Sequence, residues 1–345
     1  MVTAPSLTAA TLTTLVEAAS AAPSLHNSQP WRFRLDPVTA TLELWAAPER
    51  GLPRIDPRGR ALHLSVGAAL FNVRTAAAHL GWRTEVTLLP DPREPRVLAT
   101  VALRAGRDGP ALSDPDPHEL HELHAALWRR HTSRLPFTRR PSAHRIAELV
   151  RAAEAEGATL TVPDAVGTAR VLRLTAEAER RDTRDRARRV ETAAWVRRGT
   201  GDGLPPTALG PGDANGLVPT RDFAGPDARH PRATAAFEER PLIALLATRH
   251  DRRVDWLRAG QALERVWLTA TARTLRLAPL HQALEWPDLR AALADPAAAD
   301  EAGAGNGVGS GGGAASVQLV VRIGYGPAGV SSPRRSTWQV VERRG

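Results

Sequence analysis

The chain has 345 residues, of which 42% are hydrophobic and 24% are charged; this is the composition of a globular protein too long for one ordinary domain. Its formal net charge is +9, but every basic residue is an arginine, so the charge reflects a biased composition as much as a basic function. The lack of cysteine excludes disulfides, thiolate metal sites and cysteine nucleophiles, and no apolar run approaches the ~20 residues that span a bilayer.

The N-terminal stretch MVTAPSLTAATLTTLVEAAS has no basic start, and Glu17 interrupts its apolar face, so it is not typical of a secretory signal. We therefore expect a cytoplasmic protein without membrane contact. Apolar side chains at Leu12, Leu15 and Val16 recur at helical spacing, which predicts a helix over residues 8–20.

The rest of the chain alternates strand-like and helical segments, which indicates an α+β protein. In chain order we expect strands at 31–36 and 41–46, a helix over 61–82, strands at 84–89 and 96–103, helices over 118–129 and 143–156, a strand at 158–162, an arginine-rich helical region, a strand at 241–248, a helix over 254–275 and a strand at 316–326. Residues 199–231 are rich in glycine and proline and predict an irregular excursion. The run GAGNGVGSGGGAAS at 303–316 predicts a flexible insertion.

The densest basic run, RRDTRDRARR at 180–189, also contains acidic residues at helical spacing. The pairs four residues apart are Arg181–Asp185 and Asp182–Arg186. They suit a solvated helix face, and the interleaved aromatic residues of a nucleic-acid surface are missing, so we expect no nucleic-acid partner.

Motifs for other chemistries are weak or missing. The run HELHELH at 118–124 spaces its histidines at i, i+3 and i+6, which suits an amphipathic helix better than a zinc site, so no metal is expected. The chain has neither the G-x-S-x-G motif of serine hydrolases nor a G-x-G-x-x-G motif opening a strand–helix unit.

An internal repeat predicts the domain organisation. The stretches VGAALFNVRTAAAHLGW and AGQALERVWLTATARTL share a glycine, an Ala-Leu pair and an alanine-rich helix, and Gly67 of the first corresponds to Gly260 of the second. Each helix follows a predicted strand. We expect two pseudo-symmetric α/β halves fused in one chain, covering residues 1–115 and 116–345.

The stretch APSLHNSQPW at 22–31 is an unusual polar and aromatic turn, which we call the elbow. Together with the following residues it resembles the Ser-x-x-Asn-x-Gln-Pro-Trp signature of the nitroreductase superfamily of FMN proteins. The whole layout is similar to the Acg-like branch, in which two nitroreductase-type halves are fused. The supporting stretches, in chain order, are RRHTSRLPF, DGLP, VPTRDF, WLRAGQALERVWLTATA, APLHQALEWPDLR and RIGYGP with SPRR.

The resemblance implies a noncovalent FMN site with contributions from both halves. The positions that match are Pro23, Ser24, His26 and Asn27 in the elbow, Arg130, His131, Thr132 and Arg134 in RRHTSRLPF, Pro279, His281 and Gln282 in APLHQALE, and Arg334 and Arg335 in SPRR. The arginines would hold the phosphate, since a guanidinium makes bidentate, charge-assisted bonds and stays ionised. Ser24 and Asn27 would bond to the flavin, whereas Gln29 suits a brace within the elbow.

Several readings of these residues remain open. His26 suits either substrate contact, as the one expected catalytic residue, or a structural hydrogen bond. The elbow is also consistent with a plain capped turn, and RRHTSRLPF with a solvated basic turn. The 199–231 excursion is consistent either with a lid over the flavin, as in the Acg-like branch, or with a surface loop.

The two halves complement each other. The first has no arginine before Arg32 to grip a phosphate, and the second has no elbow. This predicts one FMN per chain and a monomer with an internal pseudo-dimer, with further oligomerisation open.

The function that the resemblance implies is that of an FMN-dependent oxidoreductase. NAD(P)H would deliver hydride to flavin N5, and a nitroaromatic or quinone would then take the electrons by a ping-pong route. The alternatives are a protein that sequesters FMN under a lid with little turnover, and an arginine-rich binding module with an empty site. The sequence does not choose between NADH and NADPH or name a physiological substrate.

Overall fold

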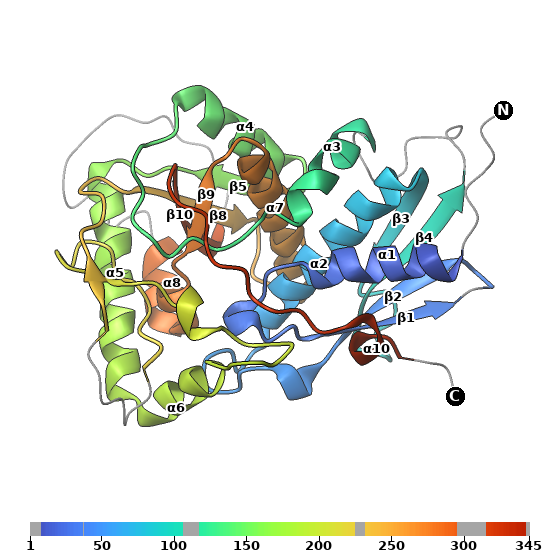
Figure 1. Ribbon diagram of the computed structural model, residues 1–345, viewed down its shortest axis with the longest axis horizontal. Coiled ribbons are helices and arrows are strands. Elements are labelled where there is room, and N and C mark those ends of the chain that lie inside the picture. The colour runs from blue at the N-terminus through green and yellow to red at the C-terminus, as the bar shows by residue number, and fades with distance from the viewer. Residues whose placement is uncertain (1–7, 37, 106–116, 225–231, 295–314, 343–345) are drawn as a thin grey trace.

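The computed structural model describes residues 8–36, 38–105, 117–224, 232–294 and 315–342 (Figure 1). The chain is an α+β protein in which one set of elements occurs twice. The first unit contains α1 (Ala9–Ser20), β1 (Trp31–Asp36), β2 (Thr41–Ala46), α2 (Arg60–His79), β3 (Trp82–Leu88) and β4 (Val97–Ala105). The second contains α4 (Ala143–Glu154), β5 (Thr159–Thr161), β8 (Leu242–Thr248), α7 (Arg253–Ala272), β9 (Arg276–Pro279) and β10 (Ser316–Gly324).

The two sheets share one topology. Their strand orders are β1-β2-β4-β3 and β5-β8-β10-β9, so the elements correspond one for one along the chain, and all neighbouring strands are antiparallel. The repeat seen in the sequence is therefore a repeat of structure. The expected division at residue 115 falls in 106–116, outside the described residues.

The central helices α2 and α7 lie in the middle of the molecule, between the two sheets (Figure 1). They touch at the two glycines that the repeat aligns. A Cβ atom on Gly67 would lie 2.2 Å from the carbonyl oxygen of Leu257, and one on Gly260 would lie 2.1 Å from that of Leu64. Both distances are far below van der Waals contact, so only glycine lets the two backbones approach this closely.

Other elements connect or cover the two units. The longer ones are α3 (Pro117–Leu127), α5 (Ala165–Arg184), α6 (Arg186–Ala194) and α8 (Pro287–Ala294), and the shorter ones are η1 (Leu25–Asn27), η2 (Pro48–Arg50), η3 (Pro206–Ala208), β6 (Gly212–Asp213), β7 (Thr234–Ala235), η4 (Gln282–Glu285) and α10 (Thr337–Val340). The chain between β5 and β8 holds α5, α6 and the described part of the 199–231 excursion. This insertion belongs to the second unit alone.

After β10 the chain returns to the first unit through an extended C-terminal strap, residues 326–336, which leads into α10 (Figure 1). Beyond α10, Val341 pairs with Phe33 of β1, and the Glu342 N–H donates to the Phe33 carbonyl oxygen at 2.8 Å. The strap is therefore anchored to the first sheet.

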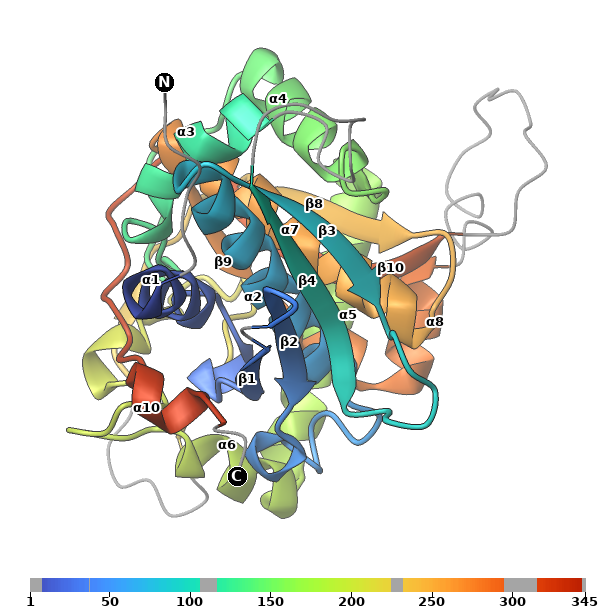
Figure 2. The ribbon, with the colours of Figure 1, turned by 90° about the vertical axis from the view of Figure 1, so that its right-hand side faces the viewer.

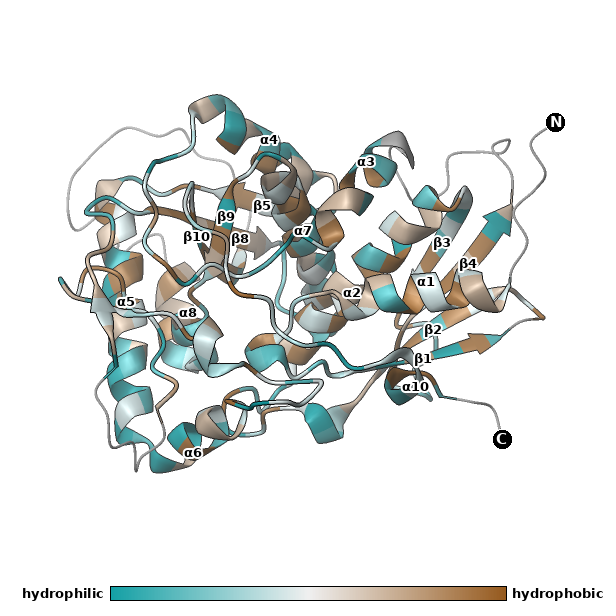
Figure 3. Ribbon diagram, in the orientation of Figure 1, coloured by the Kyte–Doolittle hydropathy of each residue, from teal (hydrophilic) through white to brown (hydrophobic). Residues whose placement is uncertain are grey.

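Figure 2 shows the molecule from the side of the first sheet, with β2, β3 and β4 in front. Hydrophobic residues concentrate on the strands and on the central helices, whereas α5 and α6 are largely hydrophilic (Figure 3). Trp31 and Phe33 are fully buried in the core of the first unit, and Trp267 is buried in that of the second. Within the described ranges, no helix has both the length and the apolarity to cross a bilayer.

Two expectations need correction. The helix predicted to run to Trp82 ends at His79, since Gly81 adopts a φ of 79° and Trp82 begins β3. The expected pairs within RRDTRDRARR do not form, because Asp182 is buried and binds Arg188 instead. Most of the expected 303–316 insertion lies outside the described residues.

Candidate functional site

The elbow turns sharply after α1 and carries three residues in the left-handed backbone region. His26, Asn27 and Gln29 have φ values of 55°, 54° and 51°. Asparagine tolerates this conformation, but histidine and glutamine do so at a cost, and such strain persists only where surrounding contacts over-determine it. The elbow must therefore be held by its neighbours.

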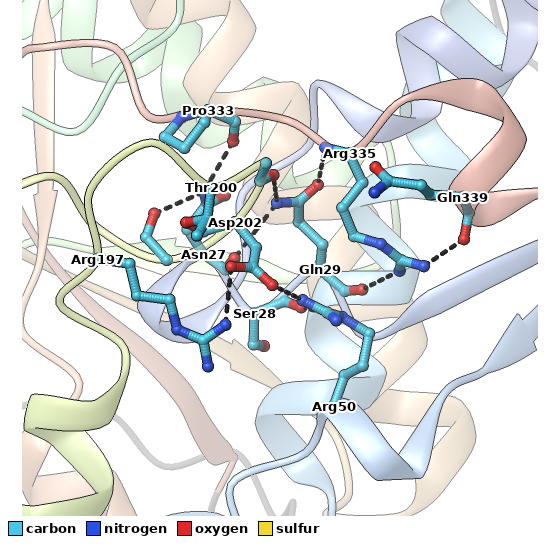
Figure 4. Close-up of polar contacts among 12 residues, drawn as sticks. Asn27, Ser28, Gln29, Arg50, Arg197, Thr200, Asp202, Pro333, Arg335 and Gln339 are labelled. Atoms are coloured by element: carbon cyan, nitrogen blue, oxygen red, sulfur yellow. Dashed lines mark hydrogen bonds and ion pairs between the residues drawn. The ribbon is translucent and has the colours of Figure 1, made fainter.

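The Asn27 side chain supplies one set of these contacts. Its Nδ2 donates to the carbonyl oxygens of Gly203 and Pro333, both at 2.8 Å (Figure 4). Its Oδ1 accepts from Arg334 Nη1 at 3.0 Å. Asn27 is 4% exposed. One buried amide thus ties the elbow to the excursion and to the C-terminal strap.

Gln29 supplies a second set. Its Nε2 donates to the Gly201 carbonyl oxygen at 2.9 Å, and its Oε1 accepts from the Arg335 backbone N–H at 2.9 Å (Figure 4). The loop that presents Gly201 is fixed in turn because Asp202 accepts hydrogen bonds from both Arg50 and Arg197. Gln29 therefore braces the elbow.

A cavity of about 970 Å³, counting its open mouth, lies between the elbow and the crossing of α2 with α7. Its apolar lining residues are Pro23, Leu25, Ala61, Leu64, Phe223, Leu263, Trp267, Ala278, Pro279, Leu280 and Leu319. Its polar ones are Ser24, His26, Ser65, Thr132, Arg134, Thr220, Arg221, His281, Gln282 and Arg322. Both units, the excursion and the segment after α3 contribute, so the cavity exists only where they meet. Mostly apolar walls with a few polar groups are typical of a cofactor or small-molecule site.

A smaller space, which we call the arginine pocket, adjoins this cavity. It is lined by Pro23, Ser24, Asn27, Arg130, His131, Thr132, Arg134, Leu204, Val330, Ser332 and Arg334. Four of these residues also line the cavity, so the two spaces adjoin at Pro23, Ser24, Thr132 and Arg134.

Two guanidinium groups of the arginine pocket have no carboxylate partner among the described residues. Arg134 donates to the Ala208 carbonyl oxygen at 2.8 Å, and Arg334 donates to carbonyl oxygens, including that of Ala21 at 3.0 Å. Burial and neighbouring arginines lower the pKa of Arg134 to about 10 and that of Arg334 to about 9. Both groups are still cationic near pH 7, so the pocket presents positive charge that an anion would balance.

Arg130 differs from these two. Its Nε lies 3.2 Å from Glu264 Oε1, its Nη2 donates to the Ala21 carbonyl oxygen at 2.8 Å, and its guanidinium lies over the Trp267 ring. The charge of Arg130 is thus shared with a buried carboxylate.

Comparison with known proteins identifies the family. No protein-family model matches the chain. It is 33% identical, over 97% of its length and 92% of the relative, to the Mycobacterium tuberculosis protein named "Putative NAD(P)H nitroreductase Rv3131". The chain belongs to the nitroreductase family. Another M. tuberculosis relative, "Putative NAD(P)H nitroreductase acg", is 29% identical over 74% of the chain and 75% of the relative.

A solved nitroreductase-family structure also matches, described as a putative nitroreductase from Anabaena variabilis. It is 11% identical, with a TM-score of 0.46, over 92% of this chain and 88% of that one. The expected α+β class with paired units is confirmed by the topology of this nitroreductase-family chain itself.

Two buried histidines face the cavity of this nitroreductase-family chain in their neutral form. His26 is 4% exposed, its Nε2 has no hydrogen-bond partner among the described residues, and burial, Arg221 and Arg134 hold its pKa well below the usual value. Burial, with help from Arg60 and Arg221, lowers the pKa of His281 to about 3. Near pH 7 each ring therefore offers one donor and one acceptor, and His26 Nε2 is free to use.

The structure brings together all but one of the expected site residues. Those that line the cavity or the arginine pocket are Pro23, Ser24, His26, Asn27, Arg130, His131, Thr132, Arg134, Pro279, His281, Gln282 and Arg334. Arg335 lines neither space, and its backbone N–H holds Gln29. Because Asn27 already uses both ends of its amide, its direct contact with a ligand stays a prediction.

Several lining residues were not expected from the sequence. Phe223 packs edge-to-face against His26 with 5.5 Å between ring centroids, and Arg221 is held by Asp182 and Glu285. The sequence pointed to these residues only as part of VPTRDF, a stretch that supports the resemblance, and of the 199–231 excursion, without a role for either one. For the helix residues that face the cavity, such as Leu64 and Trp267, the repeat indicated the helices but not the face.

Proposed function

We propose that the chain binds FMN, with the phosphate in the arginine pocket and the ring in the adjoining cavity, and acts as an NAD(P)H oxidoreductase. One observation carries the proposal: among the described residues, no carboxylate lies within ion-pair distance of Arg134 or Arg334, two partly buried cations at one end of a mostly apolar cavity. A cation withdrawn from water without a paired carboxylate is costly, so an anionic ligand group at this position would relieve it.

The donor set fits FMN in both of its parts. Guanidinium groups match the three acceptor oxygens of a phosphate monoester, and Arg334 Nε is a further buried donor without a partner. The cavity offers apolar walls for a planar ring, while His26, His281 and Gln282 border it with neutral polar groups for the ring edge. A ligand with an anionic tail and an aromatic head suits both spaces at once.

Bound FMN would supply the redox chemistry, by taking a hydride and passing electrons to an acceptor. The chain's own groups would position and shield it. Arg134 and Arg334 would hold the phosphate, the apolar walls would exclude water, and neutral His26 would present Nε2 to a substrate in the space that it borders with Phe223. NAD(P)H and the acceptor would use this one space in turn, which predicts ping-pong kinetics.

The contact of Phe223 with His26 also favours a second candidate, an FMN-sequestering protein with little turnover. Phe223 is 6% exposed and lies under the Arg134 guanidinium, so the excursion covers the space in which a second substrate would bind. The nitroaromatic or quinone acceptor, the single FMN per chain, the monomeric state and the cytoplasmic location stay predictions.

The test is reconstitution. The purified protein, incubated with FMN and freed of excess by gel filtration, is expected to retain the visible absorption of one oxidised flavin per chain. The double variant Arg134→Met with Arg334→Met is expected to lose it, whereas Arg335→Met is expected to keep it. Circular dichroism confirms that each variant folds. Retention of flavin by the double variant would contradict the proposed phosphate site.

Anaerobic addition of NADH or NADPH to the reconstituted protein then separates the two candidates. Bleaching of the flavin within seconds, followed by recovery with a nitroaromatic or a quinone, is the result expected of a reductase. Flavin that is bound but not bleached would identify a sequestering protein.

A further inference from the structure

Beneath the arginine pocket, α7 carries a carboxylate that the proposed function does not use. Glu264 is 0% exposed, and neither of its carboxylate oxygens has a hydrogen-bond partner among the described residues. Its one close cation is Arg130, whose Nε lies 3.2 Å from Oε1. Arg130 Nε also has no well-formed hydrogen bond, so this is an ion pair with poor geometry in a dry environment.

The groups that face Glu264 come from three places. Arg130 precedes the Thr132 segment, Arg334 lies on the C-terminal strap, and Asn72 approaches from α2. Burial raises the pKa of Glu264 to about 7, although the attraction of Arg130 opposes this. Other charged side chains near α7 pair elsewhere: Arg74 of α2 with Glu156, Glu119 of α3 with Arg265, and Arg265 also with Glu156.

We propose that a phosphate monoester entering the arginine pocket places one proton from solvent on Glu264. This inference rests on the proposed FMN site and concerns its regulation. Arg130 and Arg334 line the pocket and are also the cations that keep the Glu264 carboxylate ionised. An incoming dianion would compete for both guanidinium groups and repel the carboxylate, so the neutral acid becomes the favoured form.

The surroundings of Glu264 suit the neutral acid. A protonated carboxyl group gains one O–H donor. As it is oriented, the Asn72 amide favours the ionised carboxylate, but its buried Oδ1 is an acceptor without a partner among the described residues, so an O–H on Glu264 would have an acceptor nearby. Protonation would thus satisfy a polar atom that the ionised state leaves unpaired.

The consequence is a pH-dependent affinity. If one proton binds with each phosphate, the affinity falls by up to about tenfold per pH unit once the pH exceeds the pKa of free Glu264. The phosphate itself stays dianionic in this range, because its second pKa is about 6. FMN would be held best near or below neutral pH and released in alkali.

Apart from the arginines, His131 is the one titratable side chain among the described residues that line the arginine pocket. It is half-buried, and burial together with Arg130 and Arg334 lowers its pKa. An anion would also favour its protonated form. The experiment must therefore distinguish Glu264 from His131.

The experiment is calorimetric titration of the flavin-free protein with FMN at about pH 8, where the phosphate is dianionic, in two buffers of different ionisation enthalpy. The difference in heat gives the number of protons taken up. We expect uptake approaching one proton for FMN and close to none for riboflavin, which lacks the phosphate. Glu264→Gln is expected to abolish the uptake and to flatten the pH dependence of FMN affinity, whereas His131→Asn is expected to retain both.

The other possible results would contradict either the proposed function or the proposed proton uptake by Glu264. FMN that does not bind the wild-type protein at any pH would refute the proposed function. FMN that binds without proton uptake would refute this inference and leave the function standing, and uptake lost in His131→Asn would assign the proton elsewhere. Because Glu264→Gln leaves Arg130 buried without a counterion, it could fail to fold; the wild-type comparison of FMN with riboflavin and the His131 variant then decide.

Discussion

The two units have the same topology, but they differ at equivalent connections. The link from α1 to β1 runs from Ser20 to Trp31 and forms the strained elbow, whereas the link from α4 to β5 runs from Glu154 to Thr159 and is a short turn. One connection carries three left-handed residues that are not glycine; the other reaches the same conformation once, at Gly157. The paired scaffold is thus retained, and the loops carry what distinguishes the units.

At the connection between the first and second strands of each unit, the second unit has the longer link. Residues 37–40 join β1 to β2, whereas the link from β5 to β8 holds α5, α6 and the excursion with Arg221 and Phe223. Each unit therefore elaborates a connection that its counterpart keeps short, and both elaborations line one cavity. This divergence explains how a repeated fold forms a single, asymmetric site.

The largest expected effect comes from breaking the contact between the units. Gly67→Ala places a methyl group against the Leu257 carbonyl oxygen, so the helices must separate. We expect a loss of about 3 kcal/mol or more in the free energy of unfolding, or failure to fold. Urea denaturation measures it, with Arg258→Ala on an exposed position of α7 as the control. A loss under about 1 kcal/mol would mean that the crossing tolerates separation.

The next effect concerns the strap, which brings a cation of the second unit to the elbow of the first. Arg334→Met is expected to weaken FMN binding by roughly 10- to 100-fold, since charge-assisted bonds contribute about 1.5–3 kcal/mol each. Arg334→Lys keeps the positive charge but loses the planar guanidinium that can make two bonds to a phosphate. Its affinity for FMN should therefore lie between those of the wild-type protein and Arg334→Met. Fluorescence quenching of FMN gives the dissociation constants. Equal affinities for all three proteins would remove Arg334 from the site.

A smaller effect is expected within the elbow. Asn27→Ala removes the three hydrogen bonds of a buried amide; the Gly203 carbonyl oxygen loses this donor, whereas the Pro333 carbonyl oxygen keeps Arg334 Nη1 at 3.1 Å. We expect a cost of about 2 kcal/mol in the free energy of unfolding. The matched control is Asn215→Ala at an exposed position, which should change it by less than about 0.5 kcal/mol. Similar values for both would mean that the elbow does not depend on this brace.

The last effect, which is small at each pH step and accumulates as the pH falls, is a pH dependence that both units share. Burial lowers the pKa of His63 to about 4, as it lowers that of His281 to about 3. The unfolded chain binds protons at these histidines below about pH 6.5, whereas the folded chain does not, so stability is lost as the pH falls from about 6.5 toward 4. Each histidine contributes up to about 1.4 kcal/mol per pH unit.

Urea unfolding at a series of pH values measures this slope. His281→Gln is expected to lower it by the share of one histidine while that of His63 remains. A slope unchanged in the variant would mean that His281 does not resist protonation.

Much of the fold could be predicted from the sequence, because local periodicity marks α1, α7 and β8 without knowledge of their partners. Strand β9 was missed, since its four residues follow closely on α7 and are too few to show alternation. The pairs expected at Arg181 and Asp182 were wrong because α5 ends at Arg184 and Asp185 caps α6, so positions 181 and 185, and 182 and 186, do not share one helix face. In the structure Arg181 binds Glu177 and Asp288, and Asp182 is buried under the excursion's Arg221.

The candidate site could be predicted only in part. The elbow motif and the arginine-rich segments pointed to residues that do converge on one place. Nothing in the sequence shows that Arg130 faces Glu264 across 134 positions of chain whereas Arg134 has no such partner. Pairing of buried charges is a property of the packed chain, so the difference between neighbouring arginines emerges only in three dimensions.

The contact between Gly67 and Gly260 also affects whether the cavity persists when the protein is dilute. A pocket formed between separate subunits is lost when dilution dissociates them. Here one polypeptide supplies both sides of the contact between α2 and α7, and the covalent link keeps the effective concentration of the two units high. A lone molecule would therefore keep the two units that border the cavity together.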